Sequence, residues 1–173
     1  EVTTQKIMLL VIISLLPAIA ASAVFFGSRA IALIAVCCSS AVLFEYLCRR
    51  VMKREQTISD MSAAVTGIIL ALDLPPTLPY WIAIVGSFIA IVIVKQLFGG
   101  LGQNFANPAI TARVVLMVSL APDMTHWILP KTAAGNAFSY DAVSSATPLV
   151  SGNASIQDLF WGSTGGCLGE TCA

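Results

Sequence analysis

The sequence predicts an all-α integral membrane protein, a multi-span helical bundle in which some helices are short or broken. Three observations favour this fold class. Of the 173 residues, 57% are hydrophobic and only 10% are charged, whereas about a quarter of a soluble domain is charged. The mean hydropathy is +0.87, and the apolar residues form runs long enough to enter a bilayer. Lysine and arginine concentrate in one short connection, which is typical of a cytoplasmic loop.

The first two spans are predicted at 7–26 and 30–47. About twenty residues, rising 1.5 Å each, cross the roughly 30 Å hydrocarbon core. Pro17 is tolerated in the first span because neighbouring helices can satisfy the carbonyl that it frees, and Gly27 begins a tight turn. A basic cluster follows the second span and consists of Arg49, Arg50, Lys53 and Arg54. This cluster predicts a cytoplasmic loop and a cytoplasmic N-terminus.

The next segment, 59–72, is apolar but too short to cross the membrane as a straight helix. It begins at Ser59-Asp60, where we predict an N-cap, and the prolines from Pro75 onward end it. Such a segment indicates either a half-helix beside an internal site or a short tilted span. A further span is predicted at 80–98, with Lys95 at the cytoplasmic interface.

A last span completes a membrane bundle over residues 1–120. Asn107-Pro108 predicts the cap and first turn of this span, at 108–120. Counting the crossings places the polar stretch 121–160 outside the cell as an extracytoplasmic loop. Residues 161–173 are predicted to start the next membrane segment, because their glycines at four-residue spacing let helices approach closely.

Charge and cysteine content narrow the function. Nine basic and nine acidic residues give a formal net charge of zero, so no nucleic-acid partner is expected. The five cysteines form no CxxC pair and the single histidine has no metal-ligand spacing, so we predict no metal site. Cys167 and Cys172 leave a disulfide or a nearby redox group open. A start at Glu1 and an end at Ala173 indicate a part of a longer protein.

Three polar residues near the last span are candidates for binding. A guanidinium on an apolar helix costs about 2.5–3.5 kcal/mol on insertion scales and normally faces a polar partner. For Arg113 this partner is either a bound anionic group or a structural one, with Glu45, Asp60 and backbone carbonyls as candidates. The amides of Asn104 and Asn107 likewise either bind a ligand or cap helix ends.

The segment 139–149 reads Ser-Tyr-Asp-Ala-Val-Ser-Ser-Ala-Thr-Pro-Leu, a polar insert in a membrane-like sequence. Alone, it fits an ordinary loop of small turn formers. Three further motifs accompany it: Ser-Asp-Met-Ser-Ala-Ala-Val-Thr-Gly at 59–67 with Leu-Pro-Pro at 74–76, Gly-Gly-Leu-Gly-Gln-Asn-Phe-Ala-Asn-Pro-Ala at 99–109, and Gly-Glu-Thr at 169–171. Together they resemble the RnfD/NqrB family, the flavin-carrying membrane subunits of the Rnf complexes and of the sodium-pumping NADH:quinone reductase.

This resemblance implies that Thr147 carries FMN through a phosphodiester bond. Neither histidine nor lysine lies within a few residues of Thr147, so a separate flavin transferase is expected to form the bond. Small neighbours, Ser145 and Ala146, leave the hydroxyl reachable for that enzyme, and Asp141 is expected to hold a divalent cation during the transfer.

The resemblance also implies neighbours for the flavin. Arg113 would neutralise the flavin phosphate or the anion of the reduced ring, and Asn104 and Asn107 would bond the pyrimidine edge. A second, noncovalent riboflavin in the same subunit is implied too. The remaining part of such a subunit would be a further membrane bundle, so that this chain is half of an inverted-repeat architecture.

We therefore expect a subunit of an ion-translocating ferredoxin:NAD oxidoreductase, the Rnf complex, in the bacterial cytoplasmic (inner) membrane. It would pass electrons between its FMN and other flavin and iron–sulfur subunits, notably a second subunit with covalent FMN. This transfer would be coupled to Na⁺ or H⁺ movement, and the chain would contain no complete active site or catalytic residue of its own. The alternatives are the NqrB subunit of the NADH:quinone reductase and a non-redox transporter or channel subunit, because broken helices and an intramembrane arginine fit a solute path equally well.

Overall fold

The structure, a computed structural model, describes residues 3–128, 155–162 and 164–170. Within these residues the secondary structure is helical and includes no strand. Two of the helices are long and apolar enough to cross a membrane, judged by length and composition, and shorter apolar helices accompany them. These features confirm the predicted all-α membrane class.

The two long helices form a hairpin. Helix α1 (Thr4–Phe26) and helix α2 (Ser28–Val51) are joined by Gly27 alone, whose φ of 73° lies in the region that favours glycine. Only Ser22 and Phe26 of α1 are buried. The rest of its apolar surface is therefore available to lipid or to another membrane segment.

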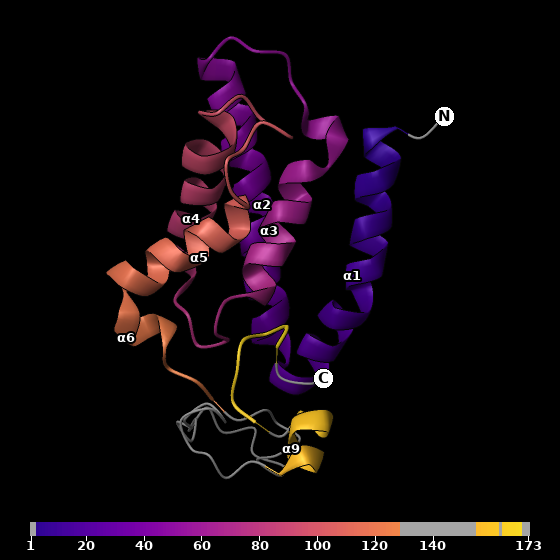
Figure 1. The fold of residues 1–173 in the computed structure, drawn as a ribbon, viewed down its shortest axis with the longest axis vertical. Helices are drawn as coiled ribbons and strands as arrows, with labels where there is room; N and C mark the ends of the chain where they lie inside the picture. The colour runs from indigo at the N-terminus through magenta and orange to yellow at the C-terminus, as the bar shows by residue number, and fades with distance from the viewer. Residues whose placement is uncertain (1–2, 129–154, 163, 171–173) are drawn as a thin grey trace.

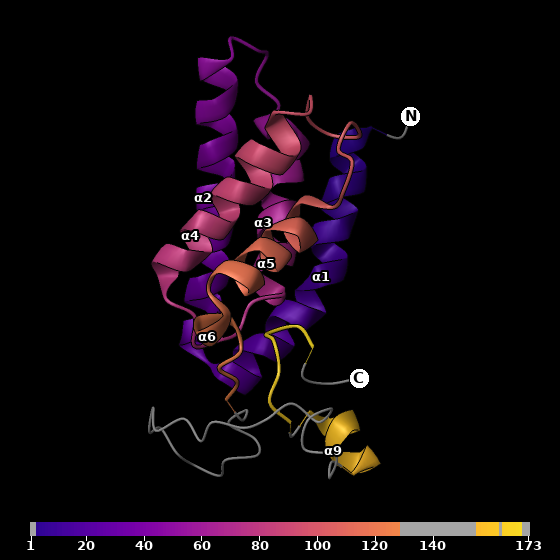
Figure 2. The same ribbon diagram turned by 60° about the vertical axis from the view of Figure 1, so that its left-hand side comes forward.

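Helix α2 is the centre of the bundle. It packs against α3 (Ser62–Leu72), α4 (Tyr80–Phe88) and η2 (Ile89–Gln96), a π-helix that continues α4. Helix α5 (Pro108–Ser119) crosses this group diagonally and contacts α3, α4 and η2 (Figures 1 and 2). Large apolar side chains from all these helices form the core, and the most fully enclosed include Leu33, Leu70, Leu78, Ile82, Ile91 and Leu116.

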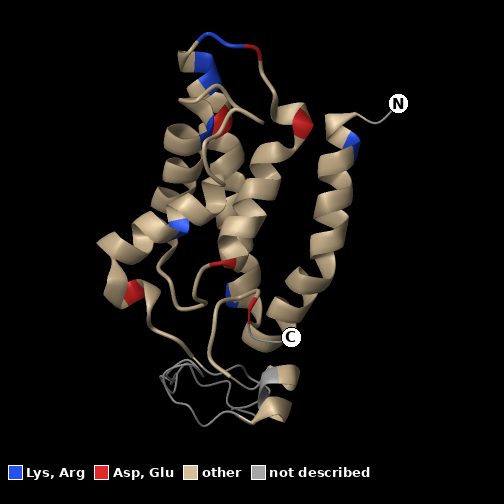
Figure 3. Ribbon diagram, viewed as in Figure 1, with Lys and Arg blue, Asp and Glu red and all other residues tan. Residues whose placement is uncertain are grey.

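The two ends of the bundle differ in charge. The loop between α2 and α3 carries the basic cluster and lies at the same end as the start of α1 (Figure 3). The α1–α2 turn, the connection from α3 to α4, and the short helices α6 (Ala121–Met124) and α9 (Ile156–Trp161) lie at the opposite end (Figure 1). The described part of the chain therefore has one basic end and one end made of connections.

The start of α3 differs from the prediction. Ser59 and Asp60 belong to a 3-10 turn, η1 (Ile58–Asp60), and no side chain caps α3. Met61, with a left-handed φ of 57°, stands at the N-cap instead, and its carbonyl accepts a hydrogen bond from the Val65 amide at 3.0 Å. The N-cap prediction is wrong because a backbone reversal at Met61, rather than a polar side chain, sets the direction of the helix.

Glycine at position 67 allows α2 and α3 to cross closely. A Cβ atom there would lie 2.8 Å from the Cys37 carbonyl oxygen and 2.9 Å from the Cys38 Cα. These are backbone atoms, so α2 itself would have to shift. We expect Gly67→Ala to lower the free energy of unfolding by about 1–3 kcal/mol, as overpacking does, measured by thermal unfolding in detergent.

The matched control is Gly86→Ala. Its new methyl group would meet the terminal Cδ1 of Leu116 at 2.8 Å, and a side-chain end can rotate away at small cost. We expect this variant to unfold close to the parent temperature. Equal losses in the two variants would contradict the role given to the backbone contact at Gly67.

Candidate functional site

Three of the seven predicted binding residues are described, and all three lie on α5 or shortly before it. Asn104 and Asn107 belong to the loop between η2 and α5, and Arg113 lies on the second turn of α5. The other four lie outside the described residues, so their roles stay predictions: Thr147, Ser145, Ala146 and Asp141.

Asn107 caps α5, as the sequence predicts. Its Oδ1 accepts hydrogen bonds from the amides of Ala109 at 3.0 Å and Ile110 at 3.5 Å, and Pro108 occupies the first turn. A side-chain acceptor at this position satisfies amides that the helix leaves unpaired. The side-chain oxygen of Asn107 is therefore in use.

Asn104 closes the preceding helix. With its amide oriented by its neighbours, the side-chain nitrogen donates to the carbonyls of Val94, Lys95 and Gly100 at 3.3, 3.2 and 3.1 Å. The first two carbonyls belong to η2. Both asparagines thus act on helix ends, which is the structural alternative that their sequence position left open.

Arg113 is the centre of a polar cluster. Its Nη1 lies 3.0 Å from Glu170 Oε1 and 3.6 Å from Asp73 Oδ1. Its Nη2 lies 3.3 Å from Glu170 Oε2 and donates to Cys167 Sγ at 3.1 Å. The candidate structural partners Glu45 and Asp60 are wrong, because the segment 164–170 folds back along the bundle and supplies the carboxylate.

The charges in this cluster leave no excess positive charge on Arg113. Two carboxylates face one guanidinium, and Asp73 lies just beyond the last residue of α3. Partial burial there raises the pKa of the Asp73 carboxyl, and the nearby Arg113 guanidinium opposes this rise. Within the described residues, no group of three or more His, Cys, Asp and Glu side chains is placed to hold a metal ion.

Removing the guanidinium will release the segment 164–170. We expect Arg113→Met to speed amide hydrogen exchange at Leu168 and Gly169 by about tenfold or more, since hydrogen bonds to charged groups are worth about 1.5–3 kcal/mol. Val118→Ala, at a position on the same helix that is 80% exposed, should leave this exchange unchanged. Protected amides in the Arg113 variant would show that the backbone alone holds the segment.

The connection from α3 to α4 is where segments far apart in sequence meet. Arg29, at the start of α2, donates to the carbonyls of Pro76 and Thr77 at 2.9 Å each and to that of Leu78 at 3.4 Å. The hydroxyl of Thr77 donates to the His126 carbonyl at 2.9 Å. These bonds hold the chain after α6 against the end of the bundle.

The glycine-rich segment binds the same connection from the other direction. The amides of Leu168 and Gly169 donate to the carbonyls of Leu74 at 3.2 Å and Leu72 at 2.9 Å. A Cβ at Gly169 would lie 3.1 Å from Leu72 Cβ and 3.3 Å from its carbonyl oxygen, so only glycine fits this approach easily. The described residues on both sides of 129–154 are therefore fixed to one short connection.

A second polar cluster lies buried near the basic end and was missed by sequence reasoning. Lys95 is 1% exposed, so its prediction at the cytoplasmic interface is wrong. Its Nζ lies 3.0 Å from Glu45 Oε1 and donates to Ser62 Oγ at 2.7 Å. Gln96 Nε2 and Thr57 Oγ1 donate to the same Glu45 oxygen at 2.8 and 3.2 Å. A buried carboxylate thus binds three elements of the bundle together.

Not every atom of this cluster has a partner. Within the described residues, Glu45 Oε2 and Gln96 Oε1 are buried acceptors without a hydrogen bond. Arg49, one turn after Glu45, is 3.9 Å from Oε1 and donates to the Glu55 carbonyl at 2.7 Å. Ionisable groups inside membrane proteins commonly mark ion paths or relays. The signal in the sequence was Glu45 itself, one charged residue near the end of a long apolar run.

The fold and these clusters define a class, a multi-span helical membrane protein with paired charges inside its bundle. The identity is narrower. Residues 1–173 match the family model described as the NQR2, RnfD, RnfE family. The chain belongs to this family, which confirms the resemblance seen in its motifs.

Curated relatives, all of the RnfD type, give the similarity in numbers. The chain is 45% identical over 181 residues to the RnfD subunit of the Na(+)-translocating ferredoxin:NAD(+) oxidoreductase complex of Acetobacterium woodii, covering 99% of this chain and 54% of the relative. It is 42% identical over 135 residues to the RnfD subunit of the ion-translocating oxidoreductase complex of Escherichia coli, covering 77% and 38%. The Shigella dysenteriae protein of the same name is 41% identical over 143 residues, covering 81% and 41%. The chain spans about half the length of the first of these relatives and less of the others.

Proposed function

We propose that this chain is part of the RnfD membrane subunit of an ion-translocating ferredoxin:NAD oxidoreductase and carries FMN on Thr147. The observation that carries the proposal is the 45% identity to the Acetobacterium woodii subunit along 99% of the chain, joined to the threonine motif at 139–149. The NqrB subunit of the NADH:quinone reductase is the second candidate, because the family model includes NQR2 proteins. The curated relatives named above favour RnfD.

We infer an orientation in the bacterial cytoplasmic membrane with the basic end inside. The charge difference between the ends of the bundle supports it, since short loops rich in lysine and arginine stay cytoplasmic. The chain on either side of 129–154 lies at the other end, with α6 and α9 (Figures 1 and 3). Thr147 would accordingly be extracytoplasmic, where a covalent bond keeps the flavin from being lost.

The described residues suggest distinct roles around the flavin. Arg113 is already neutralised by two carboxylates, so it fits a positioning residue that holds the segment after the attachment motif better than a ligand of the flavin phosphate. Asn104 and Asn107 offer uncharged groups, which suit the pyrimidine edge of a noncovalent riboflavin. Bound FMN would supply one- and two-electron transfer.

Attachment of FMN needs help from another protein. The Thr147 oxygen would form a bond to the flavin phosphorus while its proton and a phosphate-linked leaving group depart. No histidine or lysine lies close in sequence to accept that proton. A flavin transferase would therefore supply the base, with Asp141 holding its divalent cation and Ser145 and Ala146 leaving room for the enzyme.

The subunit would exchange electrons with other flavin and iron–sulfur subunits, notably a second one with covalent FMN, and couple this transfer to Na⁺ or H⁺ movement. The buried Glu45–Lys95 cluster fits the coupling, because a membrane-buried carboxylate with an unpartnered oxygen can hold a cation or a proton.

The test is the mass of the full-length subunit, purified after expression with its native transferase. We expect a species heavier than the sequence by one phosphodiester-linked FMN, and a flavin on the peptide that contains 139–149. A subunit with the mass of the bare sequence would overturn the flavin assignment and favour the transporter or channel alternative.

A further inference from the structure

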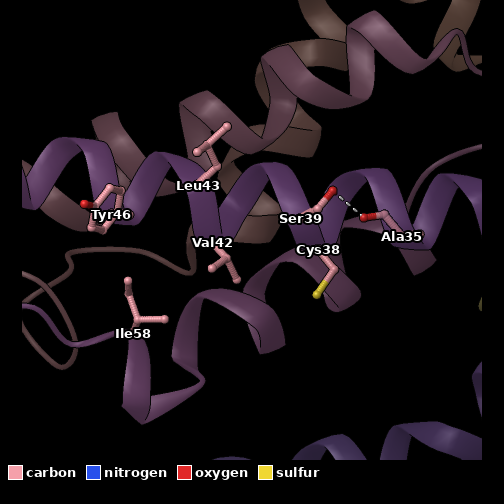
Figure 4. A pocket seen from close by; sticks show the side chains of 7 residues that line it. All are labelled: Ala35, Cys38, Ser39, Val42, Leu43, Tyr46 and Ile58. Carbon is pink, nitrogen blue, oxygen red and sulfur yellow. Dashed lines mark hydrogen bonds between the residues drawn. The ribbon is translucent and has the colours of Figure 1, made fainter.

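An apolar groove runs along α2 on the basic half of the bundle. Its lining residues are spaced three and four apart on one face of α2, from Ala35 to Tyr46, and Ile58 of η1 forms the opposite wall. Figure 4 shows Cys38 and Val42 pointing toward Ile58. The groove has a volume of about 600 Å³, within the range of ligand sites, roughly 300–1,000 Å³.

The polar atoms of the groove are mostly satisfied by the protein itself. The Ser39 hydroxyl donates to the Ala35 carbonyl at 2.7 Å and also approaches the Val36 carbonyl at 3.2 Å (Figure 4). Cys38 behaves as a small hydrophobe in such a wall. An occupant of this part of the groove therefore needs to be a hydrocarbon.

A cation stands at one end of the groove. Arg50 is exposed, and its Nη1 donates to the Tyr46 hydroxyl oxygen at 2.8 Å while the guanidinium lies 5.9 Å from the ring centroid. The Tyr46 hydroxyl can still donate its proton to another acceptor. Guanidinium and phenol together suit a phosphate oxygen, and the rest of the basic cluster follows in the loop.

The length of the groove matches one leaflet of a membrane. Eleven residue steps separate Ala35 from Tyr46, which at 1.5 Å each gives about 16 Å. Half of the hydrocarbon core is about 15 Å. An acyl chain that starts at Tyr46 would reach Ala35 near the middle of the bilayer.

We propose that this groove is a binding site for an anionic phospholipid of the cytoplasmic leaflet. One acyl chain lies along α2 between Cys38, Val42 and Ile58, and the phosphate is bound by Arg50 and Tyr46. The proposal rests on the orientation proposed above but not on the flavin. Anionic lipids are characteristic of the cytoplasmic surface, where each basic residue adds to their attraction.

The experiment is native mass spectrometry of the purified full-length protein, exposed to phosphatidylglycerol or phosphatidylcholine with identical acyl chains. We expect the parent to retain phosphatidylglycerol in preference. Arg50→Gln should reduce this preference about fivefold, the effect of one basic residue at a membrane surface. Lys53→Gln, which removes the same charge from an exposed loop position outside the groove, should change the preference much less.

A second variant tests the groove rather than the charge. Val42→Phe fills the groove and should reduce the binding of both lipids, whereas Ile31→Phe, at an exposed position on the same helix, should not. Equal retention of the two lipids by the parent, or an unchanged preference in Arg50→Gln, would overturn the proposal. Capture of a neighbouring protein subunit by a Ser39→Cys cross-link in the intact complex would overturn it as well, and assign the groove to a protein interface. Bare Thr147 would leave every one of these results unaffected.

Discussion

Thr147→Ala will remove all covalent flavin from the subunit. The proposed bond needs the Thr147 side-chain oxygen, and alanine offers no atom that can take its place. The measurement is flavin fluorescence of the denatured subunit in a gel, with the parent and the variant expressed beside the native transferase. We expect a fluorescent band in the parent and none in the variant at equal protein amounts.

Two matched variants sharpen this result. Thr147→Ser keeps the oxygen and should retain part of the fluorescence, while Thr164→Ala removes a threonine from the segment 164–170 and should retain all of it. Fluorescence that persists in Thr147→Ala would place the flavin on another residue. Absence of fluorescence in the parent itself would remove the redox proposal for this chain.

Lys95→Met will cost the bundle about 3–5 kcal/mol, because it leaves the buried Glu45 carboxylate without its ion-pair partner. Lys95 Nζ and Glu45 Oε1 are 3.0 Å apart, and both side chains are almost completely enclosed. The free energy of unfolding in detergent is the quantity to measure. Lys53→Met makes the same chemical change at an exposed loop position and should cost little.

The double variant Glu45→Gln with Lys95→Met isolates the interaction. Removing both charges avoids a lone buried ion, so we expect its loss of stability to be smaller than the sum of the two single losses. Strict additivity would mean that the two side chains do not interact. In that case the small exposure of Lys95 would have another cause.

Sequence reasoning succeeded where the physics is local. The Asn107 cap and the Pro108 first turn depend on neighbours within three residues, and Gly27 is recognisable because two apolar runs meet at it. The family was recognisable from motifs along the chain. The four residues around Thr147 remain predictions, since they lie outside the described residues.

It failed where tertiary packing decides. Lys95 and Glu45 are fifty residues apart, and Arg113 and Glu170 fifty-seven, so no pattern along the chain indicates either pair. A lysine near the end of an apolar helix fits an interfacial position until another helix supplies a carboxylate. The reversal at Met61 likewise follows from the meeting of α2 and α3, not from the identity of a methionine.

The π-helix η2 links backbone geometry to the charge inside the membrane. Its bonds skip an extra residue, as in the contact of the Leu97 amide with the Val92 carbonyl at 3.1 Å. The widened turns point two consecutive side chains, Lys95 and Gln96, at one oxygen of Glu45. Tightening to the ordinary α register would rotate these two side chains apart, so that one of them would leave the carboxylate. The ionic environment of Glu45 is thus set by the winding of a neighbouring helix, and rewinding that helix by one residue would act as a mechanical switch of its counter-charge.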